Sequence, residues 1–141
     1  MEKVIITVAP TGSIVRKTDN PHVPLTPEEI GETAYLCAQE GAAVIHVHCR
    51  GADGNATREY AVFRKTVDAI RKRTNLVVMV STSGIAGTTD EARAAPLRTR
   101  PEMGSLTTGS VNFAGPKAAG RVHESVGDGP VPRAADARPR D

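Results

Sequence analysis

Two histidines, His46 and His48, stand one residue apart in the apolar run of residues 42–49, and their type and spacing are suited to chemistry. Side chains alternate between the faces of a strand, so both imidazoles share one face if this run is a strand. Their Cα atoms are then about 6.5–7 Å apart, which lets both rings bind one cation. Alternatively, both are buried histidines that form hydrogen bonds within the fold. The spacing alone leaves both interpretations open.

Hydroxyl groups and glycines follow the other apolar runs of the sequence. Thr11-Gly12 comes after the first run, residues 81–84 (Ser-Thr-Ser-Gly) come after the third, and Ser105 lies near the fourth. Sites in parallel α/β proteins form at the carboxyl ends of strands, so we expect these groups and the histidines to face one cavity. Hydroxyl and N–H donors beside a metal suit an oxygen-rich anionic substrate. Each hydroxyl has an alternative role in a turn or a helix cap.

Several other polar residues are weaker candidates. Arg50 follows the histidine pair directly, where it is expected either to hold a carboxylate near the site or to form a structural ion pair. His22 reaches the site only if its loop folds over the strand ends. His123 and Glu124 lie in a Gly- and Pro-rich segment and are not expected to bind metal.

The composition restricts the function classes. The chain has 141 residues, enough for one domain or part of a larger one, and only 3% are aromatic. Its net charge of +2 without a basic stripe argues against nucleic-acid binding. No apolar run reaches membrane-spanning length, so no membrane partner is expected. Two cysteines, Cys37 and Cys49, give no disulfide framework and indicate a reducing compartment, the cytoplasm.

The periodicity predicts alternating strands and helices. Predicted strands cover residues 4–9, 42–48, 76–80 and 103–106, the first of them buried on both faces. Predicted helices start at the capping-box sequence Thr26-Pro27-Glu28-Glu29 and stop near Gly41, span residues 58–73, and span residues 88–95 before Pro96 stops the helix. This order is typical of a parallel α/β sheet or barrel.

The last part of the chain has a different composition. Residues 115–141 are rich in Gly, Pro, Ala and Arg and show no period of two or 3.6. We therefore expect a folded part over residues 1–114 and a disordered C-terminal tail over 115–141. A shifted reading frame is our hypothesis for the origin of the tail, which sequencing of the encoding DNA tests.

Six stretches, in order, resemble the β-keto acid cleavage enzymes, whose best-known activity is 3-keto-5-aminohexanoate cleavage. The stretches are residues 6–12 (Ile-Thr-Val-Ala-Pro-Thr-Gly), 24–30 (Pro-Leu-Thr-Pro-Glu-Glu-Ile), 41–48 (Gly-Ala-Ala-Val-Ile-His-Val-His), 53–54 (Asp-Gly), 80–84 (Val-Ser-Thr-Ser-Gly) and 101–106 (Pro-Glu-Met-Gly-Ser-Leu). The match covers about residues 4–113 at the spacing of the family.

This resemblance implies the first half of a (β/α)8 TIM barrel, with about four parallel βα units, in an enzyme that forms a homotetramer. It implies a Zn2+ or similar divalent ion held by His46 and His48, and substrate binding by Ser81, Gly84 and Ser105, to which we add Thr82 from the same loop. The implied reaction uses acetyl-CoA as co-substrate and converts a small-molecule β-keto acid into acetoacetate and a new acyl-CoA. A metal on the ketone oxygen would stabilise the charge that develops there.

The sequence also departs from the family pattern. Ile14 stands where aminohexanoate-cleaving members carry a glutamate, so a different keto acid is expected. The third metal ligand of the family and the assisting aspartate and arginine belong to the second half of the barrel, which leaves the catalytic residues unknown and predicts an inactive chain. The competing interpretations are a flavodoxin-like binding module with structural histidines and a non-catalytic remnant that associates with an intact homologue.

Overall fold

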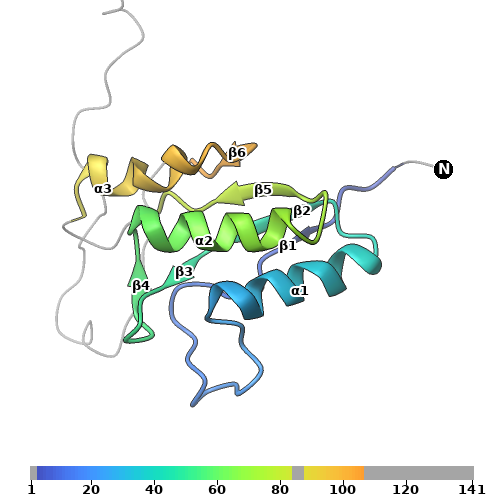
Figure 1. Ribbon diagram of the computed structural model, residues 1–141, viewed down its shortest axis with the longest axis horizontal. Helices are drawn as coiled ribbons and strands as arrows, with labels where there is room; N and C mark the ends of the chain where they lie inside the picture. The colour runs from blue at the N-terminus through green and yellow to red at the C-terminus, as the bar shows by residue number, and fades with distance from the viewer. Residues whose placement is uncertain (1–2, 84–87, 107–141) are drawn as a thin grey trace, which may run out of the picture. The chain divides into compact units, whose positions relative to one another are not determined.

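The computed structural model describes residues 3–83 and 88–106 (Figure 1). Its elements are β1 (Thr7–Val8), α1 (Pro27–Gln39), β2 (Val44–Val47), β3 (Cys49–Arg50), β4 (Ala56–Thr57), α2 (Tyr60–Arg71), β5 (Val77–Val80), α3 (Asp90–Ala94), the 3-10 helix η1 (Ala95–Thr99) and β6 (Met103–Gly104). Gly84 and the predicted tail at 115–141 fall outside the described residues. Within residues 3–83 and 88–106, no helix combines the length and apolarity that crossing a bilayer requires.

Four strands form one parallel sheet in the order β1-β2-β5-β6. Each strand therefore lies beside the one that precedes it in the βα series, and the predicted parallel α/β architecture is confirmed. A flavodoxin-like sheet has the strand order 2-1-3-4-5, in which the second and third strands lie on opposite sides of the first. The sequential order observed here is the one found in (β/α)8 barrels.

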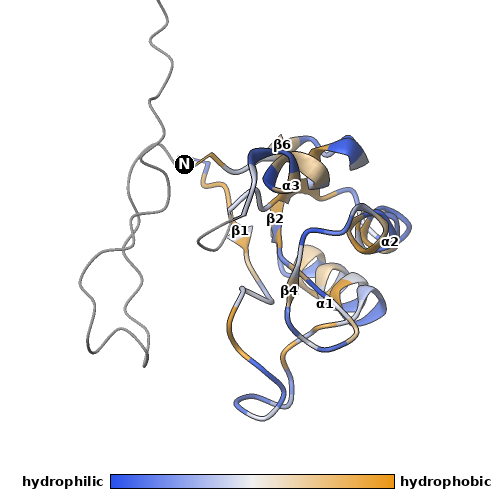
Figure 2. Ribbon diagram, turned by 90° about the vertical axis from the view of Figure 1, so that its left-hand side faces the viewer, coloured by the Kyte–Doolittle hydropathy of each residue, from blue (hydrophilic) through white to orange (hydrophobic). Residues whose placement is uncertain are grey.

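Helices α1 and α2 pack against the same face of the sheet (Figures 1 and 2). Strand residues that point to this face are fully buried, as Ile45, Val47, Val78 and Val80 are. The apolar face of α2 meets them with the four residues that its spacing predicted: Phe63, Thr66, Val67 and Ile70. Burial of apolar surface between one sheet face and two helices is thus the main source of stability.

Helix α1 begins and ends where the sequence predicted. The Thr26 hydroxyl accepts a hydrogen bond from the Glu29 N–H, and the Glu29 carboxylate accepts one from the Thr26 N–H, which completes the capping box. Gly41 follows the last turn with a φ of 92°, a conformation that favours glycine. Gly31 lets α1 approach α2 closely, because a Cβ there would lie 3.1 Å from the Ala69 Cβ.

The first strand differs from its prediction. β1 contains only Thr7 and Val8, while Val4, Ile5 and Ile6 are exposed by 83%, 74% and 48%. The prediction of a strand buried on both faces was wrong, because β1 lies at the edge of the sheet and pairs only with β2 among the described strands.

Two further local features were not predicted. Residues 49–57 form a hairpin, in which β3 pairs antiparallel with β4 across the predicted turn. Pro96 does not stop the helical segment at residue 95. It occupies the first turn of η1, where a missing N–H costs nothing, and the segment runs on to Thr99. Arg100 then ends it in the left-handed conformation, with a φ of 54°.

Candidate functional site

The two histidines lie side by side at the end of β2. His46 Nε2 and His48 Nε2 are 3.1 Å apart, and the rings stand at 70° to each other with centroids separated by 4.9 Å. The prediction that both imidazoles share one strand face is confirmed. Two nitrogen ligands of one tetrahedral zinc ion, each at about 2.0–2.1 Å, lie about 3.3 Å from each other. The observed distance fits two ligands of a single cation.

The surroundings keep both imidazoles neutral. Burial lowers the pKa of His46. Burial, followed by repulsion from His46 when it is protonated, from Arg58 and from Arg50, lowers the pKa of His48 to about 4. Neutral imidazole is the form that binds metal, so protons do not compete for these nitrogens near pH 7. The Nδ1 atoms of both rings are buried and have no hydrogen-bond partner in the described part of the chain.

The loop after β5 carries the predicted substrate-binding hydroxyls. Ser81 is buried, its N–H donates to the Val47 carbonyl at 3.0 Å, and its Oγ lies 2.9 Å from that of Ser83. The Thr82 N–H donates to Ser105 Oγ at 3.1 Å, and the Thr82 hydroxyl donates to the Ser105 carbonyl. The structure thus joins the ends of β5 and β6 through residues that the sequence singled out.

The strand register divides these hydroxyls between the two faces of the sheet, and the expectation that they and the histidines face one cavity stays a prediction. A cavity of about 440 Å³ lies between α3, η1 and the end of β6, and its lining includes Thr82, Arg93 and Ser105. Neither the histidines nor Ser81 are among the described residues that line it. The register of β2 and β5 explains the division: Val47 pairs with Val80, so Ser81 continues on the face of His48 and Thr82 points to the opposite face.

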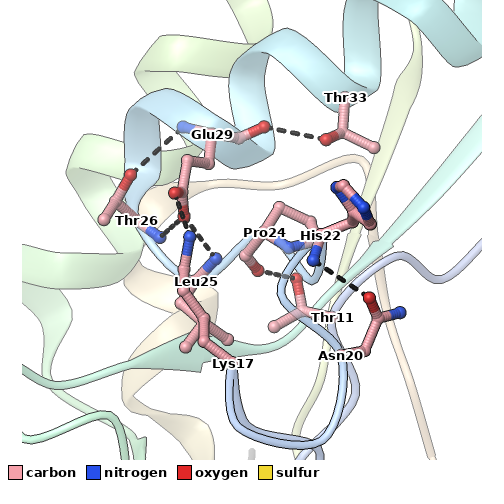
Figure 3. A network of polar contacts seen from close by, with 9 residues as sticks. All are labelled: Thr11, Lys17, Asn20, His22, Pro24, Leu25, Thr26, Glu29 and Thr33. Carbon is pink, nitrogen blue, oxygen red and sulfur yellow. Dashed lines mark hydrogen bonds and ion pairs between the residues drawn. The ribbon is translucent and has the colours of Figure 1, made fainter.

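Thr11 and Arg50 hold the loop after β1 in place. Thr11 is buried and donates to the Pro24 carbonyl at 3.0 Å (Figure 3). Arg50, also buried, donates to the carbonyls of Gly12, Val15 and Gly54 at 3.0–3.1 Å. The structural ion pair expected of Arg50 is absent among residues 3–83 and 88–106, and contact with the carboxylate of a ligand stays a prediction.

His22 does not lie over the histidine pair as a buried group. Its side chain is exposed, and its backbone N–H donates to Asn20 Oδ1 at 2.9 Å (Figure 3). Over residues 3–83 and 88–106, no cluster of three or more His, Cys, Asp or Glu side chains is positioned to hold a metal. His46 and His48 are thus a pair without a described third ligand.

Two arginines beside the site were missed in the sequence. Arg58 donates from Nη1 to the Thr57 carbonyl at 3.1 Å and from Nη2 to the Ser83 carbonyl. Arg93 donates from Nε to the Thr82 carbonyl at 3.2 Å. One feature of the sequence could have identified Arg58: it stands just before the N-terminus of α2, where the helix dipole disfavours a positive charge. Arg93 lies in the last turn of α3, where a cation is common, so nothing in the sequence distinguished it.

Curated proteins that are similar to this chain act on keto acids according to their names. The chain is 43% identical over 116 residues to a 3-keto-5-aminohexanoate cleavage enzyme of Fusobacterium nucleatum, covering 82% of this chain and 43% of the relative. It is 43% identical over 110 residues to a 3-oxoadipate:acetyl-CoA acetyltransferase of Cupriavidus necator, covering 77% and 38%. The chain therefore spans less than half the length of these curated relatives.

Solved structures and a family model agree with these relatives. The apo structure of ObcA superimposes with a TM-score of 0.59 at 26% identity, over 66% of this chain and 24% of ObcA. The model of the beta-keto acid cleavage enzyme family matches residues 3–136, nearly the whole chain. The parallel sheet, the histidine pair and these matches agree, and the chain belongs to the β-keto acid cleavage enzyme family.

Proposed function

We propose that this chain supplies the metal-binding histidines and part of the substrate site of an enzyme that cleaves a β-keto acid with acetyl-CoA. The observation that carries the proposal is the neutral imidazole pair, with Nε2 atoms 3.1 Å apart, at the carboxyl end of β2. The names of relatives support the co-substrate, since acetyl-CoA appears in the names of three transferases, which are named for 3,5-dioxohexanoate, 3-oxoadipate and 3-dehydrocarnitine.

In this proposal, His46 and His48 bind one Zn2+ or similar divalent ion through their Nε2 atoms. The donor set fits, because imidazole nitrogens suit zinc and both pKa values lie below neutrality. The bound ion would polarise the ketone and stabilise the negative charge that C–C cleavage places on its oxygen. The protein's part is to keep the imidazoles deprotonated and fixed on one strand face.

The keto acid carboxylate is assigned to the loop after β5. Ser81 is level with His48 and carries a hydroxyl that can donate to a carboxylate, and Gly84 lies three residues further along. Thr82 and Ser105 hold the two strand ends together and line the neighbouring cavity. Ile14 is exposed and apolar, so this position offers no carboxylate for a substrate amino group.

We also propose that the chain on its own is inactive. Catalytic zinc sites usually have three protein ligands and a water, whereas the described residues bring together two histidines. A homotetrameric state and a cytoplasmic location complete the proposal. Gel filtration and cell fractionation test these last two points.

Zinc binding is the direct test. Titration should give weak zinc binding by the purified chain, loss of at least tenfold in affinity in either His46→Ala or His48→Ala, and no change in His22→Ala, the exposed control. Equal affinities in all four proteins would refute the metal site. Zinc near one per chain, together with acetoacetate formed from acetyl-CoA and a β-keto acid, would refute the proposed inactivity.

A further inference from the structure

Arg58 is a positive charge at the strand ends that lacks a carboxylate partner. Among residues 3–83 and 88–106, five ion pairs are present, and Arg58 takes part in none of them. Its Nη atoms contact two backbone carbonyls, while its Nε is buried and has no partner there. A guanidinium has further N–H donors beyond these two bonds, so Arg58 can accommodate an additional acceptor.

A second guanidinium lies near Arg58. Arg93 donates to Thr82, the residue before the Arg58 acceptor Ser83, and its own acidic neighbour is weakly held. Asp90 Oδ1 is 3.8 Å from Arg93 Nη1, and its side chain is 95% exposed. Burial is the main cause that lowers the pKa of Arg58, and repulsion by the positive charge of Arg93 lowers it further. An anion bound here would relieve both costs.

The position of Arg58 indicates which of the two proposed substrates could bring an anionic group to it. Its charge acts on His48 and on Cys49, and its Nη2 contacts the loop that begins at Ser81. The Cys49 thiol adds no negative charge, because burial raises its pKa to about 11. The phosphates of acetyl-CoA are separated from its thioester by the long pantetheine arm. A substrate group that carries negative charge beside the histidine pair would therefore belong to the small β-keto acid and not to acetyl-CoA.

We propose that Arg58 binds a second carboxylate of the substrate, which makes the substrate a β-keto dicarboxylic acid. This inference rests on the proposed function, in which the first carboxylate is assigned to the loop that starts at Ser81. Guanidinium and carboxylate form short, charge-assisted and often bidentate hydrogen bonds, and Nη1 and Nη2 of Arg58 each keep one N–H beyond the bond to a backbone carbonyl.

Binding of two acids of equal length tests the proposal without the reaction. Glutarate carries two carboxylates and pentanoate one, and calorimetric titrations with EDTA present remove any contribution of metal. We expect the full chain to bind glutarate at least tenfold more tightly than pentanoate. Arg58→Met should remove this preference, since hydrogen bonds to charged groups are worth about 1.5–3 kcal/mol. Arg64→Met, an exposed arginine on α2, should keep it.

Each remaining outcome decides the question. A wild-type chain that binds both acids equally, or a preference that survives in Arg58→Met, overturns the proposal. Weakened binding of coenzyme A with an unchanged glutarate preference assigns Arg58 to phosphate and also overturns it. Should Arg58→Met not fold, Arg58→Lys and Arg58→Gln replace it, and an unchanged preference in both is contrary evidence. Zinc titration of the same variants in buffer without EDTA separates these results from a failure of the proposed metal site.

Discussion

The two faces of residues 44–49, which run from β2 into β3, carry different residues and are covered differently. Ile45, Val47 and Cys49 point to the helices and are at most 1% exposed. His46 and His48 point to the other side, remain partly exposed, and keep Nδ1 atoms that have no described partner. Along this short segment, densely packed apolar side chains therefore alternate with imidazoles whose Nδ1 atoms have no described hydrogen-bond partner.

This contrast separates the residues that stabilise the fold from those that are available to a ligand. A buried nitrogen without a hydrogen bond costs about 1–3 kcal/mol, so the histidine face is not the most stable that a sheet could have. The helix face shows no such cost among the described core residues, all of which are apolar or hydrogen-bonded. Substitutions on the two faces should consequently have different effects.

The largest effect is expected from Ile45→Ala on the helix face. Ile45 is fully buried, and its truncation removes packing and leaves a cavity, so the free energy of unfolding should fall by about 3 kcal/mol. Met79, which pairs with His46 on the other face, is the matched control, and Met79→Ala should cost about 1 kcal/mol. Urea denaturation measures both. Equal losses would mean that the two faces do not differ in packing.

Arg50→Met should have the next largest effect, because Arg50 connects β3 to the loop after β1. The substitution removes the donors to the carbonyls of Gly12, Val15 and Gly54 and should destabilise the chain by about 2 kcal/mol. Arg64→Met removes an exposed arginine of α2 and should change stability by no more than about 0.5 kcal/mol. Thermal unfolding of both variants would show whether Arg50 holds the loop, and similar midpoints would contradict that role.

The helix face was the more predictable of the two. Period-3.6 spacing identified Phe63, Thr66, Val67 and Ile70, and the capping box fixed the start of α1, because local side-chain patterns determine these features. The extent of β1 was not predictable in this way. Strand burial depends on position in the sheet, and an edge strand has the same apolar sequence as a central one.

The site was predictable only in part. Spacing placed His46 and His48 on one face, as observed, since alternation along a strand is a local property. The contacts of Arg58 with Ser83 and of Arg93 with Thr82 join segments distant in sequence, so no local pattern encodes them. Arg50 forms no ion pair with a described residue and donates to three loop carbonyls, a result that depends on how two loops fold together and that no local pattern encodes.

A smaller, pH-dependent effect on stability is expected at the start of α1, one of the two helices that pack on the sheet. Hydrogen bonds from Lys17 and from the N–H groups of Leu25 and Thr26 lower the pKa of Glu29 to about 2 (Figure 3). A depressed carboxyl pKa stabilises the fold above the ordinary value near 4.5, and this contribution is lost as the pH falls towards 2. Because Glu29 is 38% exposed, solvent screening limits it to about 1 kcal/mol.

Glu29→Gln tests this contribution, since glutamine has nearly the same shape but cannot ionise. The difference in unfolding free energy from the wild type should be constant between pH 5 and 7, shrink below pH 4.5 and vanish near pH 2. Glu28→Gln removes a charge from the same helix turn without touching the capping box and serves as the control. A difference that persists at pH 2 would mean that the lost interaction does not depend on the carboxylate charge.

The smallest effect on stability, and the sharpest contrast between the faces, is expected from His46→Leu. Leucine removes a buried nitrogen that has no described partner, so with EDTA present the free energy of unfolding should rise by up to about 1 kcal/mol. The same substitution should abolish zinc binding, whereas His22→Leu should leave it unchanged. Chemical denaturation and zinc titration of both variants measure the two effects. A clear loss of stability in His46→Leu would show that the imidazole is part of the packing rather than held ready for a ligand.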